Sequence, residues 1–264
     1  MFKQTYSCRI NDKKEIAPGI VEMKAGSREI VEQAKPGQFL NIKCCDGMNA
    51  LLRRPISICD TDRERQEVRF IFQIKGEGTK LLAAKSVGDY IDILGPLGTP
   101  FNLEQKFSKP LLVGGGIGVF PLLMLAKQFA PENTGVYLGF RNKEAVVLED
   151  EFSRVCSELS VATDDGSYGM KGYVTQLLAE RLKQGTTDVV YACGPEPMLK
   201  LVQKICGTYA VPCQLSLEQR MGCGIGACLV CACKIKTRKG DDWEYKHVCK
   251  DGPVFRGDEV IFDA

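Results

Sequence analysis

Four cysteines in the C-terminal part of the 264-residue chain have a spacing that suits metal chemistry. Cys223, Cys228, Cys231 and Cys249 form the pattern C-x4-C-x2-C-x17-C, the plant-type spacing for a [2Fe–2S] cluster. Glycines among the first three let a tight loop wrap closely, with its backbone N–H groups directed at sulfur. Structural zinc is the alternative, although zinc sites usually pair two short two-cysteine motifs. We therefore predict a [2Fe–2S] cluster on these four thiolates.

The remaining cysteines and the single histidine carry weaker signals. Thirteen cysteines are an odd number, which excludes a complete disulfide framework. Cysteines clustered in a chain without a visible secretory signal more often bind metal or do redox chemistry. We interpret Cys233 as a buried thiol beside the cluster rather than a ligand, and His247 as a surface or neighbouring residue rather than a catalyst. Trp243, in a charged stretch, is a candidate partner contact.

A glycine turn is the second chemical signal. Gly114, Gly115, Gly116 and Gly118 lie between an apolar strand (110–113) and an apolar helical stretch (121–129). Glycines let a backbone approach a pyrophosphate, and a helix N-terminus favours its negative charge. The turn departs from G-x-G-x-x-G and lacks the acid expected about 20 residues later, so a plain tight turn is the alternative. We predict that it cradles a dinucleotide.

Two further strand ends carry polar groups. Cys193 and Gly194 follow the strand at 188–192, and Asp164 and Asp165 follow the strand at 161–163. Open α/β sheets bind ligands at the carboxyl ends of their strands. Paired carboxylates would accept hydrogen bonds from a ribose diol and repel a 2′-phosphate, which favours NAD over NADP. A solvated Asp-Gly turn is the alternative for the aspartates.

Three kinds of sequence pattern succeed one another along the chain. The first hundred residues read as short alternating strands, typical of an antiparallel barrel or sandwich. From 110 to 209, strands alternate with helical stretches, which predicts a doubly wound parallel α/β sheet. From about 211 the chain is rich in Cys and Gly with little apolar periodicity, as a cofactor-held appendage would be.

The amino-acid composition limits the classes of partner that we expect. Lys and Arg total 35 against 33 Asp and Glu, a net charge of +2, which suggests neither nucleic-acid binding nor attraction to acidic membranes. The sequence shows no apolar run near the roughly 18–20 residues that span a bilayer, and no signal peptide. We expect a soluble cytoplasmic protein.

Together these motifs resemble the ferredoxin–NADP reductase superfamily and, more closely, the electron-transfer subunits of bacterial NAD-dependent, B-type dihydroorotate dehydrogenases. The likeness covers nearly the whole chain and rests on residues 54–57, 76–82, 114–121, 163–168, 193–198 and 217–231. It implies an FAD-binding β-barrel at 1–103, an NAD-binding domain at 104–212 and a [2Fe–2S] domain at 213–264.

The resemblance also implies an FAD site. Arg54 would pair with the FAD pyrophosphate, since its planar fork matches phosphate oxygens, and Ser57 would hydrogen-bond the isoalloxazine ring. This chain has Phe72-Gln73 where the family often has Tyr-Arg, so a second cationic phosphate contact is not implied there. The other residues that match the family's flavin-binding strands and turn are Pro55, Ile56, Ile71, Phe72, Gln73, Gly78 and Thr79.

In such a family a separate FMN-containing catalytic subunit oxidises dihydroorotate, and two copies of each subunit form a heterotetramer. The resemblance implies that electrons pass from FMN through the [2Fe–2S] cluster to FAD and then, as hydride, to NAD+. The protein's contribution is placement and tuning of potentials. Consistently, the sequence shows no nucleophile–base pair.

Two alternatives remain at this point. A relative with another electron partner, such as a sulfide dehydrogenase or ferredoxin:NADP oxidoreductase subunit, would share the architecture. In some of these a carboxylate replaces one cluster cysteine, whereas this chain has four cysteines, which favours the dihydroorotate system. The other alternative is a zinc-stabilised binding module with a merely structural glycine turn.

Overall fold

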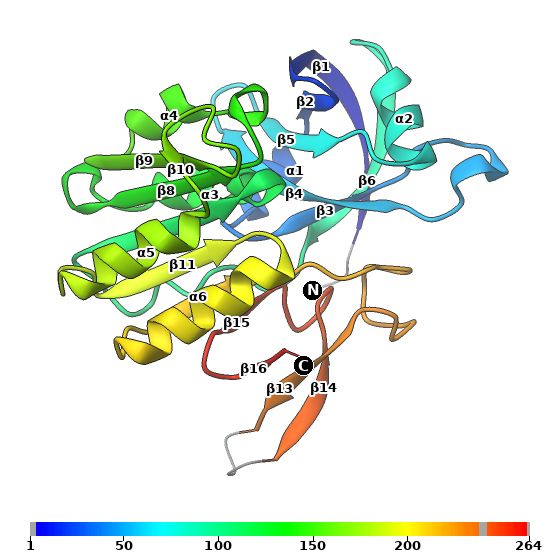
Figure 1. Ribbon diagram of the computed structural model, residues 1–264. Coiled ribbons are helices and arrows are strands. Elements are labelled where there is room, and N and C mark those ends of the chain that lie inside the picture. The colour runs from blue at the N-terminus through cyan, green and yellow to red at the C-terminus, as the bar shows by residue number, and fades with distance from the viewer. Residues whose placement is uncertain (1–3, 238–241, 263–264) are drawn as a thin grey trace.

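The computed structural model describes residues 4–237 and 242–262. The structure has a barrel, drawn mainly in blue to cyan in Figure 1, a seven-stranded sheet whose strands are mainly green to yellow, and a small three-stranded sheet in orange to red. One red strand of the C-terminal segment belongs to the seven-stranded sheet. The predicted fold class, an antiparallel barrel followed by a doubly wound sheet and a C-terminal cluster segment, is confirmed.

The N-terminal strands close into an antiparallel barrel in the order β1-β2-β5-β4-β3-β6. β6 (Tyr90–Leu97) shows the cause, because its side chains alternate along the strand and Ile91 and Ile93 are fully buried. The other strands are β1 (Thr5–Ala17), β2 (Ile20–Gly26), β3 (Phe39–Ile42), β4 (Arg54–Asp62) and β5 (Glu67–Gln73). The connections contain α1 (Arg28–Gln33), η1 (Met48–Ala50) and α2 (Glu77–Ala84).

The central sheet has the strand order β10-β9-β8-β7-β11-β12-β15, and all but β15 are parallel. Strands β8 to β10 are added on one side of β7, and β11 and β12 on its other side, so β7 and β11 form the switch point where doubly wound sheets bind ligands. The strands are β7 (Pro110–Gly115), β8 (Gly135–Phe140), β9 (Glu158–Thr163), β10 (Met170–Lys171), β11 (Val189–Cys193), β12 (Cys213–Ser216) and β15 (Val254–Arg256).

Helices cover both faces of this sheet. Alternate β7 residues point to opposite faces, so Leu111 packs in the core under α5 and α6, and Leu112 packs in the core under α3. The helices are α3 (Phe120–Ala126), α4 (Glu149–Ser153), α5 (Val174–Lys183) and α6 (Glu196–Thr208), with short turns η2 (Gly116–Val119), η3 (Pro131–Asn133) and η4 (Lys143–Ala145). In the part of the chain that the structure describes, no helix is both long and apolar enough to cross a membrane.

The C-terminal segment contributes to two sheets. β13 (Ala232–Lys236), β14 (Trp243–His247) and β16 (Val260–Ile261) form the small sheet. β12 and β15, from the same segment, extend the central sheet instead. The cluster segment therefore shares strands with the α/β unit. The domain boundary at 212/213 stays a prediction.

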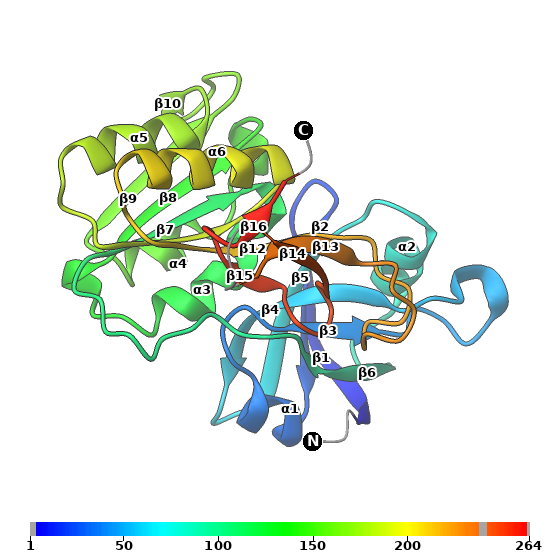
Figure 2. The ribbon, with the colours of Figure 1, turned by 90° about the horizontal axis from the view of Figure 1, so that it is seen from below.

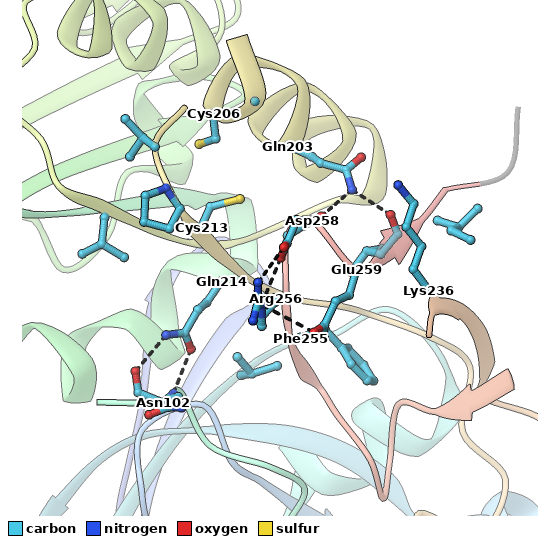
Figure 3. Close-up of a pocket in the computed structure, with 18 of the residues that line it drawn as sticks. Asn102, Gln203, Cys206, Cys213, Gln214, Lys236, Phe255, Arg256, Asp258 and Glu259 are labelled. Atoms are coloured by element: carbon cyan, nitrogen blue, oxygen red, sulfur yellow. Dashed lines mark hydrogen bonds and ion pairs between the residues drawn. The ribbon is translucent and has the colours of Figure 1, made fainter. Parts of the chain in front are cut away.

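A cavity of about 1070 Å³ marks the seam between α6 and the β12–β15 pair (Figure 3). Gln203 on α6 donates hydrogen bonds to the carbonyls of Gly257 at 2.5 Å and Val260 at 2.7 Å. Asn102 and Gln214 exchange two hydrogen bonds of 2.8 Å across the seam. None of the predicted site residues lines this cavity, so its contacts explain how the cluster segment is held against the sheet.

Candidate redox site

The cysteine loop presents backbone N–H groups to all four predicted ligands. Gly224 and Gly226 adopt left-handed φ values of +72° and +83°, which only glycine takes at low cost. The resulting N–H···S contacts reach Cys223 from Ile225 (3.4 Å) and Ala227 (3.2 Å), Cys228 from Cys223 (3.3 Å), Cys231 from Cys249 (3.5 Å) and Cys249 from Gly226 (3.1 Å). Such bonds stabilise thiolate and electron-rich sulfur.

A hairpin returns the fourth cysteine to the loop. Strands β13 and β14 pair from Ala232 opposite His247 outward, so Cys231 and Cys249 meet at the base of the hairpin. Side-chain hydrogen bonds join Cys223 to Cys228 and Cys231 to Cys249. Among the described residues, no group of three or more His, Cys, Asp or Glu side chains could hold one metal ion. The four predicted ligand thiols therefore lie in two pairs, Cys223 with Cys228 and Cys231 with Cys249.

The loop favours a thiolate at Cys223. Burial acts to raise the pKa of this thiol, but the hydrogen bonds it accepts from backbone N–H groups outweigh burial and lower its pKa to about 6. The thiolate is the form that ligates metal. The donor chemistry of the loop therefore fits an iron–sulfur cluster.

A cleft of about 650 Å³ lies between the barrel, the glycine turn and the segment after β12. It collects the predicted residues Arg54, Pro55, Ile56, Ser57, Ile71, Phe72, Gln73, Thr79, Gly118 and Cys193. The structure thus brings the implied flavin strands and part of the predicted dinucleotide site to one cavity. Gly78 lies beside it, whereas Gly114, Gly115, Gly116, Gly194, Asp164 and Asp165 are not among its lining residues.

Arg54 lies against the start of α2. A Cβ placed on Gly78 would come within 2.6 Å of Arg54 Nε, so the guanidinium packs over the glycine backbone. Arg54 Nη1 donates to the carbonyl of Leu52 at 2.5 Å. Thr79 closes the turn before α2, since its hydroxyl accepts from the N–H groups of Lys75 and Gly76. A cation at a helix N-terminus with free access from the cleft suits a phosphate.

The next strand implied to contact the flavin is β5, and it presents backbone rather than side chains to the cleft. Ile71 and Phe72 are each only 2% exposed, because they pack into the cores on either side of β5. Gln73 is exposed, and Lys75 lines the cleft two residues further on. Lys75 was not predicted from the sequence, and its position adds a cation to the cleft beside the Phe72-Gln73 pair.

At the switch point the two turns touch backbone to backbone. A Cβ on Gly118 would lie 2.4 Å from the carbonyl oxygen of Cys193 and 2.6 Å from the nitrogen of Gly194. Burial raises the pKa of the Cys193 thiol to about 12, so it is neutral at physiological pH. The predicted helical stretch at 121–129 is too long at its C-terminal end, because α3 ends at Ala126.

The paired aspartates lie farther along the same edge of the sheet. The N–H groups of Asp164 and Asp165 donate to the carbonyls of Phe140 and Arg141, which places the aspartates beside the end of β8. Asp165 Oδ1 accepts hydrogen bonds from the hydroxyl and the N–H of Ser167, which lower the pKa of its carboxyl. Asp165 therefore stabilises its own turn, and the ribose role of the Asp164–Asp165 pair stays a prediction.

Sequence reasoning missed the strand end after β12. Ser216, Glu218 and Arg220 line the cleft, and Ser216 lies in register with Cys193 on the neighbouring strand. Burial among the cleft walls raises the pKa of the Glu218 carboxyl, with Lys75 opposing this shift. The rule that parallel strands end at one edge would have found these residues, had the short strand at 213–216 been recognised.

A flavin-reductase-type barrel, an NAD-binding sheet and a plant-type cysteine loop define a class: iron–sulfur oxidoreductases linked to nicotinamide dinucleotides. The families described as "Oxidoreductase NAD-binding domain" and "Iron-sulfur cluster binding domain of dihydroorotate dehydrogenase B" match residues 112–204 and 218–261. The structure of an NADH-dependent reduced ferredoxin-NADP oxidoreductase superposes with a TM-score of 0.84 at 34% identity, covering 98% of this chain and 91% of that one. The cytochrome b5 reductase domain of Ulva prolifera nitrate reductase shares the fold at a TM-score of 0.64 and 15% identity, covering 78% and 94%.

Curated relatives are closer in sequence. The electron transfer subunit of dihydroorotate dehydrogenase B (NAD(+)) from Bacillus caldolyticus is 44% identical over 256 residues, which is 96% of each chain. The corresponding subunit from Geobacillus thermodenitrificans is 46% identical over 94% of this chain and 95% of the relative. The chain belongs to the family of electron transfer subunits of NAD-dependent dihydroorotate dehydrogenase B, and the resemblance inferred from its motifs is confirmed.

Proposed function

We propose that the chain carries electrons from the FMN of a dihydroorotate-oxidising catalytic subunit to NAD+, using the four-cysteine loop and the cleft beside it. The single observation that carries this proposal is the position of the segment 216–221. It lines the cleft and runs directly into Cys223. The flavin-binding strands, the dinucleotide turn and the cluster loop therefore lie next to one another in one part of the molecule.

FAD bound in the cleft supplies the exchange between single electrons, from the cluster, and the two electrons of a hydride. The residues that would hold it are Arg54 and Lys75 for the pyrophosphate and Ser57 for the ring. The residues that would hold NAD are the glycine turn, Cys193-Gly194 and Asp164. The protein thereby orients both groups toward one cavity and leaves the redox chemistry to them.

We place the partner's docking face around the cluster loop. Ile225, Leu229 and Val230 are exposed apolar residues of this loop, and Leu229 is 62% exposed. Leu51 and Leu52, beside η1, are exposed as well, and their loop projects on the same side of the molecule as the cluster loop in Figures 1 and 2. Apolar side chains gathered beside a redox centre suit a protein partner, here the FMN-containing subunit in a heterotetramer with two copies of each.

Reconstitution tests the proposal. The anaerobically purified chain, assayed for iron, sulfide, zinc and flavin, is mixed with an FMN-containing dihydroorotate dehydrogenase subunit and NAD+. We expect NAD+-dependent orotate formation, its loss in Leu229→Asp, and its retention in Leu201→Asp, which changes an exposed leucine of α6. Zinc without flavin would refute the proposal, and reduction of ferredoxin without orotate formation would favour the ferredoxin:NADP alternative.

Replacing Arg54 with alanine is expected to lower the affinity for FAD on the order of 10- to 100-fold, because a charge-assisted phosphate contact contributes about 1.5–3 kcal/mol. Flavin released on dilution and gel filtration measures the effect. Arg53→Ala is the matched control, since Arg53 pairs with Asp92 and with the carbonyls of Asn41 and Asp92. Equal flavin retention in Arg54→Ala and the unsubstituted protein would contradict the assignment.

Replacing Gly118 with alanine is expected to raise the KM for NADH about tenfold or more, because a methyl group 2.4 Å from the Cys193 carbonyl forces two backbones apart. Steady-state oxidation of NADH with a small dye as acceptor measures the effect. Gly207→Ala, on α6 with open space around the added methyl, is the control. An unchanged KM in Gly118→Ala would remove the turn from the dinucleotide site.

A further inference from the structure

We infer that Asn41, on β3 of the barrel, is a positioning residue that fixes the cluster loop against the flavin barrel. The inference rests on the proposed function and adds a residue that neither the motifs nor the cleft identify. Asn41 lies 182 residues before Cys223 in the chain, and its side chain donates a hydrogen bond to that cysteine.

The contact is made to the backbone of a predicted ligand. Asn41 Nδ2 donates a hydrogen bond to the carbonyl oxygen of Cys223 at 3.1 Å. A Cβ on Gly224 would lie 2.4 Å from the same nitrogen, and Gly224 has a φ of +72°. The peptide that joins Cys223 to Gly224 therefore rests directly on the Asn41 amide.

The barrel side of the contact leads to the flavin strand. Asn41 faces Pro55 in the β3–β4 register, one residue from Arg54. The backbone carbonyl of Asn41 accepts a hydrogen bond from Arg53 at 3.3 Å. A shift of Asn41 would thus move the cluster loop relative to the strand that lines the flavin cleft.

The side-chain amide of Asn41 lowers the stability of the barrel itself. Asn41 is 1% exposed, and within the described residues its Oδ1 is buried without a hydrogen-bond partner. The Cys223 carbonyl can only accept, so it fixes which end of the amide faces the loop. A leucine of similar size would fill the site without the unpaired oxygen. The contribution of asparagine is therefore its bond to the loop rather than barrel packing.

The bond sets the orientation of donors toward sulfur. The Cys223–Gly224 peptide begins the turn whose N–H groups, from Ile225 and Ala227, donate to Cys223 Sγ. Without the Asn41 amide this peptide can rotate, and the N–H groups behind it lose their alignment. Substituting a residue that supports metal ligands typically costs 10- to 100-fold in metal affinity or activity.

The test compares Asn41→Leu and Asn41→Ala, which both remove the donor, with Asn11→Leu, which removes a barrel amide bound to Glu67. In the full chain with its cofactors, we expect iron to transfer to a chelator about 10- to 100-fold faster in both Asn41 variants. The electron paramagnetic resonance spectrum and midpoint potential of the reduced cluster should shift as well. Flavin content and the urea midpoint of the iron-free Asn41→Leu chain should not fall, which separates positioning from a structural role.

Iron transfer and spectra in Asn41→Leu that match the unsubstituted protein would overturn the inference, as would a lower urea midpoint that accounts for the iron loss. An effect of equal size in Asn11→Leu would overturn it too. Absence of iron and sulfide from the unsubstituted protein would instead refute the proposed function, so the two failures are distinguishable.

Discussion

Replacing Cys228 with alanine is expected to abolish iron and sulfide binding while leaving flavin bound. Cys228 supplies one sulfur of the Cys223–Cys228 pair, and a cluster that lacks one protein thiolate has an open, hydrolysable iron. The cleft that would hold FAD does not include Cys228, so NADH oxidation with a small dye should persist. Orotate formation with the catalytic subunit should fall to the background. Iron and sulfide assays with a visible spectrum measure the first effect.

Cys233 provides the matched control for this prediction. It lies on β13 two residues after Cys231, and burial raises the pKa of its thiol to about 11, so it is protonated at neutral pH. Cys233→Ala should therefore keep iron and sulfide at the level of the unsubstituted protein. Loss of iron in Cys233→Ala, or full iron content in Cys228→Ala, would contradict the ligand set that we assign.

Candidate ligands that are close in sequence can be proposed from a pattern because their geometry is local. Cys223, Cys228 and Cys231 must share one loop, and the glycines between them allow only a tight one. The distant Cys249 was identified by spacing alone, and the β13–β14 hairpin supplies the physical reason, since it returns the chain to Cys231. The glycine turn was found in the same way, because a strand, a turn and a helix follow one another there.

Contacts between distant segments were not predictable from the sequence. Ser216 and Glu218 reach the cleft because a four-residue strand, too short for a periodicity signal, pairs beside β11. Asn41 gives no signal at all within its own strand, where it is a polar residue between buried apolar neighbours. Barrel closure and domain packing create these sites, and no local pattern encodes them.

The ion pairs that join the barrel to the α/β sheet are a further contact between distant segments that the sequence did not predict. Arg69 on β5 donates from Nε to Glu22 on β2 at 2.6 Å, and from its two terminal nitrogens to both oxygens of Glu151 on α4 at 2.5 and 2.8 Å. Glu22 is 1% exposed, and Lys14 Nζ lies 3.2 Å from its other oxygen. Arg69 therefore compensates a buried carboxylate and links the two cofactor domains at once.

Replacing Arg69 with methionine is expected to lower the free energy of unfolding by about 3–5 kcal/mol, because it leaves the Glu22 carboxylate buried without its main partner. Urea unfolding followed by circular dichroism measures the change. Arg63→Met, which removes an exposed arginine from the β4–β5 turn, should change it by less than about 1 kcal/mol. Adding Glu22→Gln to Arg69→Met should recover part of the loss, since the uncompensated charge is then removed.

The effect of Arg69→Met should also depend on pH. The hydrogen bond from Arg69 lowers the pKa of the Glu151 carboxyl below its usual value. A carboxyl whose pKa is lower in the folded state stabilises the fold fully above its unfolded pKa of about 4.3, and this stabilisation is lost as the pH falls through the folded pKa. The difference between the unsubstituted protein and Arg69→Met should therefore be largest near neutral pH and shrink below about pH 4.3. A difference that stays constant as the pH falls well below 4.3 would show that the Arg69–Glu151 pair adds nothing to stability. Equal urea midpoints at neutral pH would show the same for Arg69 as a whole.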